Sequence, residues 1–189
     1  EGVRGLTYGK PVATMRRYLE QMDQSLYLAQ KPELPPQRVI AALGPRMLEL
    51  ARDQCAGAHP YFVTPDHTRM ARDILGAEPM LCVEQKVILE TDPVLARKVA
   101  RQSAERYLAL PNYRNNWLRM GFNESDLENG GSDQFIDKTI IWGDVGKIQA
   151  GIDAHFDAGA SHVCIQPISS AGNFAEPDMN LLEQLAGRY

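Results

Sequence analysis

A short apolar run followed at once by a turn and an amphipathic helix recurs along this chain, and this order constrains the fold most. Its clearest instance is the apolar run Val39 to Leu43, which ends in Gly44-Pro45 and leads into a helical pattern with Met47 and Leu48. Strands that alternate with helices in this way pair in parallel, because each helix carries the chain back across the sheet. The sequence therefore predicts an α/β protein with a parallel sheet.

Four such strands and a series of helices are expected. The strands are predicted over residues 38–43, 58–63, 79–89 and 162–168. The helices are predicted over 11–28, 45–54, 65–76, 93–110, a short stretch within 111–131, 135–141, 145–158 and around 181–185. Four parallel strands cannot close a barrel, whereas eight can, and a complete barrel has roughly 250 residues. The pattern indicates half of a TIM (β/α)8 barrel, with 111–131 as an inserted region.

Composition narrows the class of protein. The chain has 189 residues, enough for one domain, and a net charge of −4, with no basic stripe that would neutralise the phosphates of a nucleic acid. We expect no nucleic acid and no membrane partner, because no apolar stretch approaches the length of a membrane span. The three cysteines lack metal-ligand spacing, which favours a reducing cytoplasm and no metal. Cys82 and Cys164 lie in apolar runs and are expected in the core.

The turn at Gly44, Pro45, Arg46 and Met47 is the strongest candidate binding site in the sequence. A turn between a strand and a helix directs backbone N–H groups and the positive end of the helix dipole at one point, where a phosphate can bind. Glycine allows a close approach of the backbone, and Arg46 could add a charge-assisted contact. The alternative is an ordinary strand-to-helix turn.

Seven motifs in order resemble a known family. They are Gly44–Ala51, Gly57–Tyr61, Thr64–Thr68, Glu84–Asp92, Leu110–Asn116, Trp142–Asp144 and Ala158–Gln166. Together they resemble the luciferase-like flavin and deazaflavin oxidoreductases, and among these the probable F420-dependent oxidoreductases. The resemblance covers nearly the whole of 1–189 and implies a luciferase-like TIM barrel, of which this chain holds about strands 5–8. The first half of the barrel is expected to be absent, so the chain would be a fragment or would pair with another copy.

The resemblance also implies an activity. We expect hydride transfer between coenzyme F420 and an organic substrate, with FMN as the alternative cofactor and an FMN-dependent monooxygenase as the alternative enzyme. A non-catalytic half-barrel that acts as an oligomeric scaffold is the rival from another class. A homodimer or higher homo-oligomer is expected in either case, since an open half-barrel exposes sheet edges and an apolar face.

The family alignment places Gly44, Pro45, Arg46 and Met47 in the loop that binds the cofactor phosphate. Three further side chains are candidate cofactor contacts, each with a structural alternative: His59, Thr64 and Gln166. His59 could instead pack within its strand, and Thr64 could simply cap a helix. Gln166 follows the apolar part of the last predicted strand and could hydrogen-bond the ring or a phosphate. No catalytic residue is assigned.

Other polar and aromatic residues carry weaker expectations. His67 is expected at the surface, and His155 has no nearby partner for a metal. Glu84 and Glu90 flank one predicted strand, about 20 Å apart by strand rise, and are not expected to act as an acid–base pair. The insertion contributes aromatic residues that could form a lid, a dimer contact or simple helix packing: Tyr113, Trp117 and Phe122.

Overall fold

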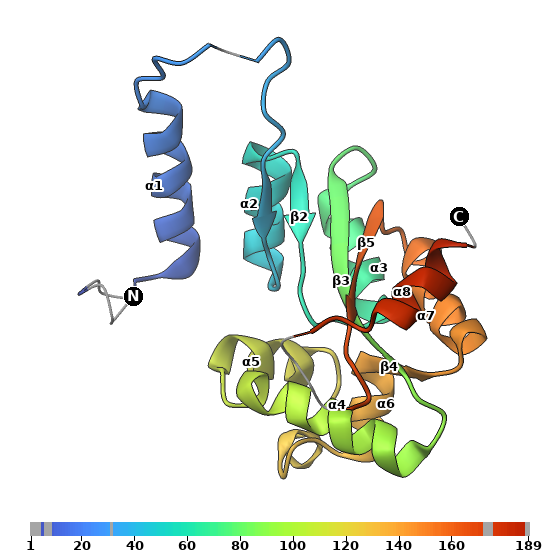
Figure 1. The fold of residues 1–189 in the computed structure, drawn as a ribbon. Helices are drawn as coiled ribbons and strands as arrows, with labels where there is room; N and C mark the ends of the chain where they lie inside the picture. The colour runs from blue at the N-terminus through green and yellow to red at the C-terminus, as the bar shows by residue number, and fades with distance from the viewer. Residues whose placement is uncertain (1–4, 6–8, 31, 172–175, 188–189) are drawn as a thin grey trace.

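The computed structural model describes residues 5, 9–30, 32–171 and 176–187, and shows helices around a parallel sheet (Figure 1). The strands are β1 (Val39–Ala41), β2 (Gly57–His59), β3 (Met80–Leu89), β4 (Ile140–Gly143) and β5 (His162–Pro167). The helices are α1 (Pro11–Gln24), α2 (Pro45–Gln54), α3 (Pro65–Leu75), α4 (Pro93–Leu108), α5 (Pro111–Arg119), η2 (Glu124–Leu127), α6 (Asp133–Thr139), α7 (Val145–Asp157) and α8 (Met179–Ala186). Every strand pairing in this sheet is parallel, which confirms the α/β expectation.

The long strand β3 organises the sheet. Strand order is β1-β2-β3-β4, and β5 pairs with β3 outside this path. Lys86 and Val87 pair with β4 and also with β5, so β4 and β5 lie on opposite edges of β3. The Glu84 N–H donates to the carbonyl of Pro60, just beyond β2, so β2 shares the β4 edge nearer the amino end of β3. The four strands predicted from the sequence correspond to β1, β2, β3 and β5.

Strand β4 corrects the sequence prediction, which extended a helix over Ile140 and Ile141. Helix α6 is capped by Ser132, whose hydroxyl accepts the Phe135 N–H, and it ends at Thr139. The next residues pair with Lys86–Leu89 instead of continuing the helix. β-Branched side chains favour a pleated, half-buried strand, so tertiary pairing decides a short apolar segment that periodicity leaves ambiguous.

Strand β2 is shorter than predicted and begins earlier. The sequence placed Gly57 at the end of a helix and a strand over 58–63, but Gly57 starts the strand and His59 ends it. A Cβ at Gly57 would lie 2.2 Å from the Met80 carbonyl oxygen, so only glycine fits this approach of β2 to β3. Extended backbone cannot continue to residue 63 as predicted, because Phe62 has a φ of 59°.

The two faces of β3 have different surroundings. Leu81 and Val83 pack with α2 and α3 residues, while Val87 packs with α7 and α8 residues, so these odd-numbered side chains face the helical layer. The even-numbered side chains project to the opposite face, because direction alternates along a strand. On that face of β5, Cys164 is exposed, and Cys82 of β3 is only half-buried. The expectation that both cysteines lie in the core is therefore wrong.

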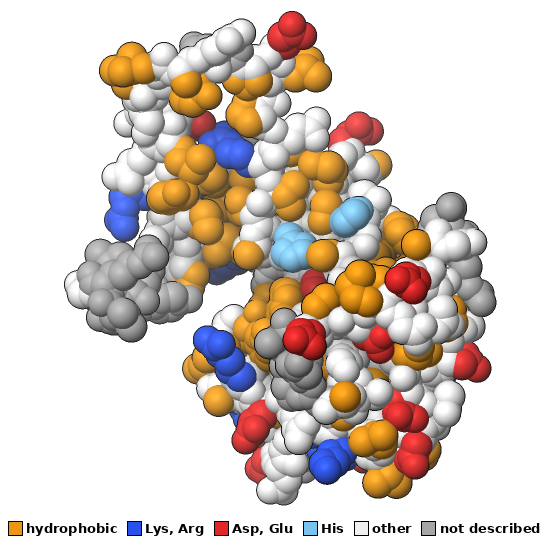
Figure 2. Space-filling view, in the orientation of Figure 1, with side chains coloured by type: hydrophobic (Ala, Val, Ile, Leu, Met, Phe, Trp, Pro, Cys, Tyr) orange, Lys and Arg blue, Asp and Glu red, His pale blue; other side chains and the backbone are white. Residues whose placement is uncertain are grey.

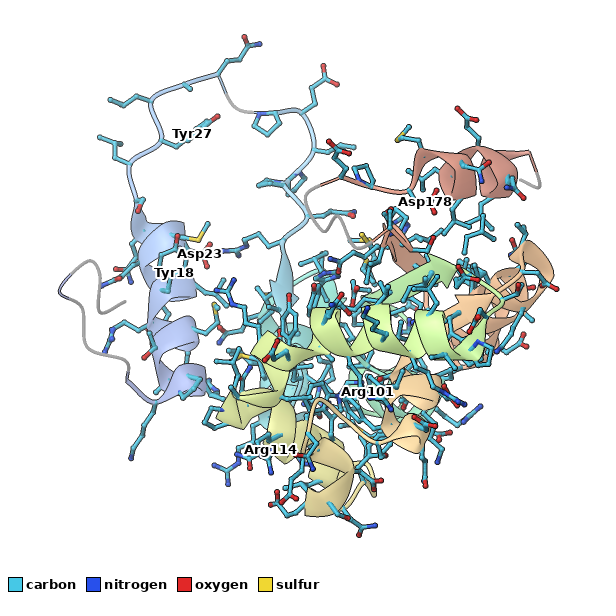
Figure 3. All side chains as sticks on the ribbon, turned by 60° about the horizontal axis from the view of Figure 1, so that its bottom comes forward. Tyr18, Asp23, Tyr27, Arg101, Arg114 and Asp178 are labelled. Atoms are coloured by element: carbon cyan, nitrogen blue, oxygen red, sulfur yellow. The ribbon has the colours of Figure 1, made fainter. Side chains whose placement is uncertain are left out.

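Two parts flank the sheet. Helix α1 stands beside it, joined by a long connection and by an ion pair of 2.9 Å between Asp23 and Arg38 (Figures 1 and 3). Beyond the carboxyl ends of the strands, α4, α5 and α6 form a second unit, in which Trp117 packs edge-on against Phe62 and Phe135. The inserted region 111–131 thus contributes α5 to a helical unit with an aromatic core.

A buried histidine joins three elements of the core. His155 of α7 is fully buried, and its Nε2–H donates to Gln85 Oε1 at 2.7 Å while its Nδ1 accepts from the Thr68 hydroxyl at 2.8 Å. Burial, with a smaller contribution from His67, lowers the pKa of His155 to about 4. The imidazole is therefore neutral, and hydrogen bonds within the core occupy both of its nitrogens.

The unfolding free energy is expected to fall as the pH drops from about 6.5 to 4. In that window the unfolded chain binds a proton that folded His155 does not, so protonation costs up to about 3 kcal/mol of stability. Urea unfolding at several pH values checks this. His155→Leu should lack this part of the slope, and His162→Gln, at an exposed strand position, should retain it. Equal slopes in wild type and His155→Leu would contradict the assignment.

Candidate functional site

A large cavity lies where α1, the β1–α2 turn, the end of β2 and α5 face one another. Its volume is about 930 Å³, and most of its surface is apolar. Figure 2 shows a hollow in this region with hydrophobic side chains on its wall. Ligand pockets are typically of this size, apolar with a few polar groups.

The β1–α2 turn forms one wall of the cavity. Pro45 is the first residue of α2, and Gly44 before it provides no side-chain cap. The N–H groups of Met47 and Leu48 bond the Gly44 carbonyl, which fixes the turn. Pro45 has no N–H group, so the Arg46 N–H and the positive end of the helix dipole are what this helix start offers to an anion.

Two arginines flank this helix start. Arg46 lies in the first turn of α2, and Arg119 comes from the end of α5. The Arg119 Nη1 atom would lie 3.9 Å from a Cβ placed on Gly44, and it donates to Asn116 Oδ1 at 3.2 Å. Neither arginine forms an ion pair with any residue that the structure describes. Their positive charge is therefore available to a ligand.

His67 supports the same turn from behind. It was expected at the surface but is fully buried, so that expectation is wrong. Its Nε2–H donates to the Leu43 carbonyl at 2.8 Å, immediately before Gly44. Burial lowers the pKa of His67, opposed by the bond to Leu43 and aided by the charge of Arg119. A neutral imidazole thus holds the backbone that leads into the helix start.

The opposite wall is aromatic and polar. His59 at the end of β2, Tyr61 two residues later and Tyr113 of α5 all line the cavity here. The Tyr61 hydroxyl donates to Gln166 Oε1 at 2.7 Å and accepts from the Tyr107 hydroxyl at 2.9 Å. Burial raises the pKa of Tyr61, and the bond from Tyr107 adds to this rise, so the phenol stays neutral. This wall offers ring faces and hydrogen-bonding groups to a flat ligand.

A buried ion pair lies behind Tyr61. Glu84 and Lys86 point to the same face of β3, with 3.1 Å between Lys86 Nζ and Glu84 Oε1, and their side chains are 3% and 1% exposed. Glu84 Oε2 also accepts the Phe62 N–H at 2.9 Å. Burial lowers the pKa of Lys86 to about 8, against the attraction of Glu84.

The structure brings together five of the seven predicted cofactor residues. The lining of the 930 Å³ cavity includes Gly44, Pro45, Arg46, Met47 and His59. The Nδ1–H of His59 also donates to the Cys82 carbonyl at 2.6 Å. This nitrogen therefore packs against the neighbouring strand, as the structural alternative for His59 predicted.

The other two predicted cofactor residues lie outside this cavity. Thr64 caps α3, with its hydroxyl accepting the His67 N–H at 3.4 Å, and it lines a separate cavity of about 190 Å³. The capping alternative therefore holds for Thr64, and its cofactor contact stays a prediction. Gln166 lines a third cavity of about 530 Å³ and reaches the large one only through Tyr61.

The remaining candidates take structural positions. Tyr113 lines the cavity, whereas Trp117 and Phe122 are buried in the aromatic core, where the Trp117 indole N–H donates to the Phe62 carbonyl. Glu84 pairs with Lys86, and the Glu90 carboxylate accepts the Asp92 N–H. The expectation of no acid–base pair between these glutamates agrees with those partners.

Sequence reasoning missed three residues that shape the site: Tyr61, Lys86 and Arg119. Lys86 sits in a strand predicted to be buried, and a lysine at such a position is the signal that could have found it. Arg119 gives no such signal, because it approaches Gly44 only through the packing of α5. In the described part of the chain, no group of three metal-binding side chains occurs and no helix is long and apolar enough to cross a membrane.

Two solved structures resemble this chain in fold. An F420-dependent secondary alcohol dehydrogenase in complex with an F420–acetone adduct matches 77% of this chain and 46% of its own length, with 13% identity and a TM-score of 0.54. The crystal structure of apo-MsnO8 matches 93% of this chain and 60% of its own, with 18% identity and a TM-score of 0.56. The chain has an α/β fold with a parallel sheet, like part of a TIM barrel.

The resemblance seen in the sequence is thus confirmed for the fold. The chain spans about half the length of the solved structures it matches. No family model matches the sequence. No curated protein matches it either.

Proposed function

We propose that this chain supplies the cofactor-binding part of an oxidoreductase that transfers hydride between coenzyme F420 and a small organic substrate. The observation that carries the proposal is the uncapped start of α2, flanked by Arg46 and Arg119, opening on an apolar cavity of about 930 Å³. The structural likeness to an F420-dependent alcohol dehydrogenase supports the choice of cofactor. FMN, which also joins a flat ring to a phosphate, is the alternative.

The cavity residues fit such a ligand in two zones. The Gly44 turn and Arg119 would bind the phosphate of the tail through N–H groups and charge. His59, Tyr61 and Tyr113 would hold the ring, since aromatic faces and hydroxyl groups match a flat, polar-edged system. The bound deazaflavin supplies the hydride chemistry, while the protein binds and orients it.

Binding measurements with purified protein test the proposal. Coenzyme F420 should bind at micromolar concentration, measured as a change in the fluorescence of the cofactor or of the protein. FMN should bind more weakly. Riboflavin, which lacks the phosphate, serves as the control for the ring alone. Tight FMN binding without F420 binding would replace the cofactor, and binding of neither compound would overturn the proposal.

Arg119→Ala is expected to weaken F420 and FMN binding about tenfold to a hundredfold. The substitution removes a charge-assisted contact to phosphate, which is typically worth about 1.5–3 kcal/mol. Riboflavin affinity should stay within a factor of two. Arg52→Ala, in the last turn of the same helix α2, is the matched control and should leave all three affinities unchanged. A uniform loss across the three ligands would place Arg119 outside the phosphate zone.

A scaffold function is the second candidate, and one observation favours it. The side chains His162, Cys164 and Gln166 of β5 are exposed along one face of the sheet. We propose that a second copy of this chain covers that face in a homo-oligomer. Light scattering on the purified chain tests this, with a stable dimer and no cofactor uptake as the result expected for a scaffold. A monomer that binds F420 would remove it.

A further inference from the structure

Lys86 is the most deeply buried charged side chain near the cavity. Its amino group contacts Glu84 and lies over two aromatic rings, 3.9 Å from the Tyr61 ring centroid and 4.1 Å from that of Phe62. The Tyr107 ring centroid follows at 5.0 Å. A cation at these distances is attracted to the negative ring faces, and the attraction strengthens when water is excluded.

The segment that carries Tyr61 is held in an unfavourable conformation. Phe62 has a φ of 59°, which a bulky residue rarely adopts. Its N–H donates to Glu84 Oε2, and its carbonyl accepts from the Trp117 indole. Strained backbone persists only when its surroundings hold it, and it gathers at functional sites. The ion pair therefore contacts this turn twice: Glu84 accepts the Phe62 N–H, and Lys86 lies over the rings of Tyr61 and Phe62.

We propose that Lys86 is a positioning residue for the cavity, whose charged amino group, held by Glu84, keeps Tyr61 in the wall that faces the ligand. The charge attracts the ring of Tyr61, and the hydrogen bonds to Tyr107 and Gln166 set the direction of its hydroxyl. Loss of the charge releases the turn at Phe62, and Tyr61 leaves the wall. The inference rests on the proposed function only for the identity of the ligand.

This arrangement predicts a response to alkaline pH. Burial lowers the pKa of Lys86 to about 8, so the amino group loses its proton between about pH 7 and 9.5. The groups around it are Glu84 on β3, Tyr61 after β2, Tyr107 and Arg106 on α4, and Glu176 before α8. Cys164 of β5 lies opposite Glu84 in the sheet register, and the Glu84→Gln/Lys86→Met variant described next separates Lys86 from all these groups.

A ligand-free experiment tests the inference separately from the cofactor. In a Trp142→Phe background, Trp117 reports on Phe62, because its indole bonds the Phe62 carbonyl. We expect its fluorescence to change between pH 7 and 9.5 with a midpoint near 8, while circular dichroism shows the protein still folded. The double variant Glu84→Gln/Lys86→Met removes both charges without leaving one unpaired and should show a flat profile. Lys98→Met, at an exposed lysine of α4, should keep the change.

Ligand binding gives the second readout. F420 and FMN affinities should fall about threefold to tenfold from pH 7 to 9.5 in wild type, the range of a single hydrogen bond, and remain constant in the double variant. A flat Trp117 profile in folded wild type overturns the inference, whether or not a cofactor binds. A Trp117 transition near pH 8 without any cofactor binding supports the inference and contradicts the proposed function instead.

Discussion

Replacing Glu84 with leucine is expected to lower the free energy of unfolding by about 3–5 kcal/mol. The carboxylate is the ionic partner of Lys86, and both side chains are almost completely buried. Its removal leaves an ammonium group without a counter-charge in a medium that solvates it poorly. It also leaves the Phe62 N–H without its acceptor. Urea denaturation at pH 7 measures the loss.

The double variant Glu84→Leu/Lys86→Met is the control for this prediction. It removes both charges and fills the space with apolar atoms, which is often neutral or stabilising compared with a buried ion pair. We expect it to recover most of the stability lost in the single variant. Raising the pH should also relieve the single variant, because loss of Glu84 lowers the pKa of Lys86 further and the unpaired amino group loses its proton more readily than in wild type. A single variant as stable as wild type would show that the pair is not buried as described.

Gly57→Ala is expected to cost about 3 kcal/mol or more. The new Cβ would lie 2.2 Å from the Met80 carbonyl oxygen and 2.8 Å from the Met80 Cβ, both on the neighbouring strand. Overpacking typically costs about 1–3 kcal/mol, and contact with rigid backbone places this site at the upper end. Thermal and urea unfolding measure the effect, and weaker F420 binding should follow because β2 carries His59 into the cavity.

Gly187→Ala is the matched control for that substitution. A Cβ at Gly187, after α8, would meet no atom within 4 Å. Its φ of −73° suits alanine as well as glycine, so the change should stay within about 0.5 kcal/mol. Equal effects of the two substitutions would contradict the close approach of β2 to β3.

Local patterns were enough to predict much of the fold. Proline at the first position of α2, α3 and α4, together with caps such as Asp92 and Asp144, marks helix starts that the structure confirms, whereas Pro111, predicted to end a helix, begins α5. The Gly44 turn was predicted correctly as a strand–helix junction for the same reason. Periodicity failed at Ile140, where a short apolar segment takes its structure from pairing with β3.

The candidate site could be predicted only in part, because much of it is assembled by tertiary packing. Gly44 and His59 lie at strand ends, and parallel strands bring such ends together. Arg119 reaches the same point through the insertion, and its place depends on the packing of Trp117 and its neighbours in the aromatic core. His67 was misplaced because a helix-start position suggested exposure, whereas its bond to Leu43 buries it.

The location of the turn between β1 and α2 has a consequence for local unfolding. Strand β1 precedes that turn and pairs with β2 over three residues, whereas β3 pairs with three strands along ten residues. Amide hydrogens of β1 should therefore exchange with solvent early, and those in the middle of β3 last. A ligand that contacts both Gly44 and Arg119 would connect β1, the strand expected to exchange first, to the unit formed by α4, α5 and α6. Binding of such a ligand should therefore slow deuterium uptake at residues 39–44.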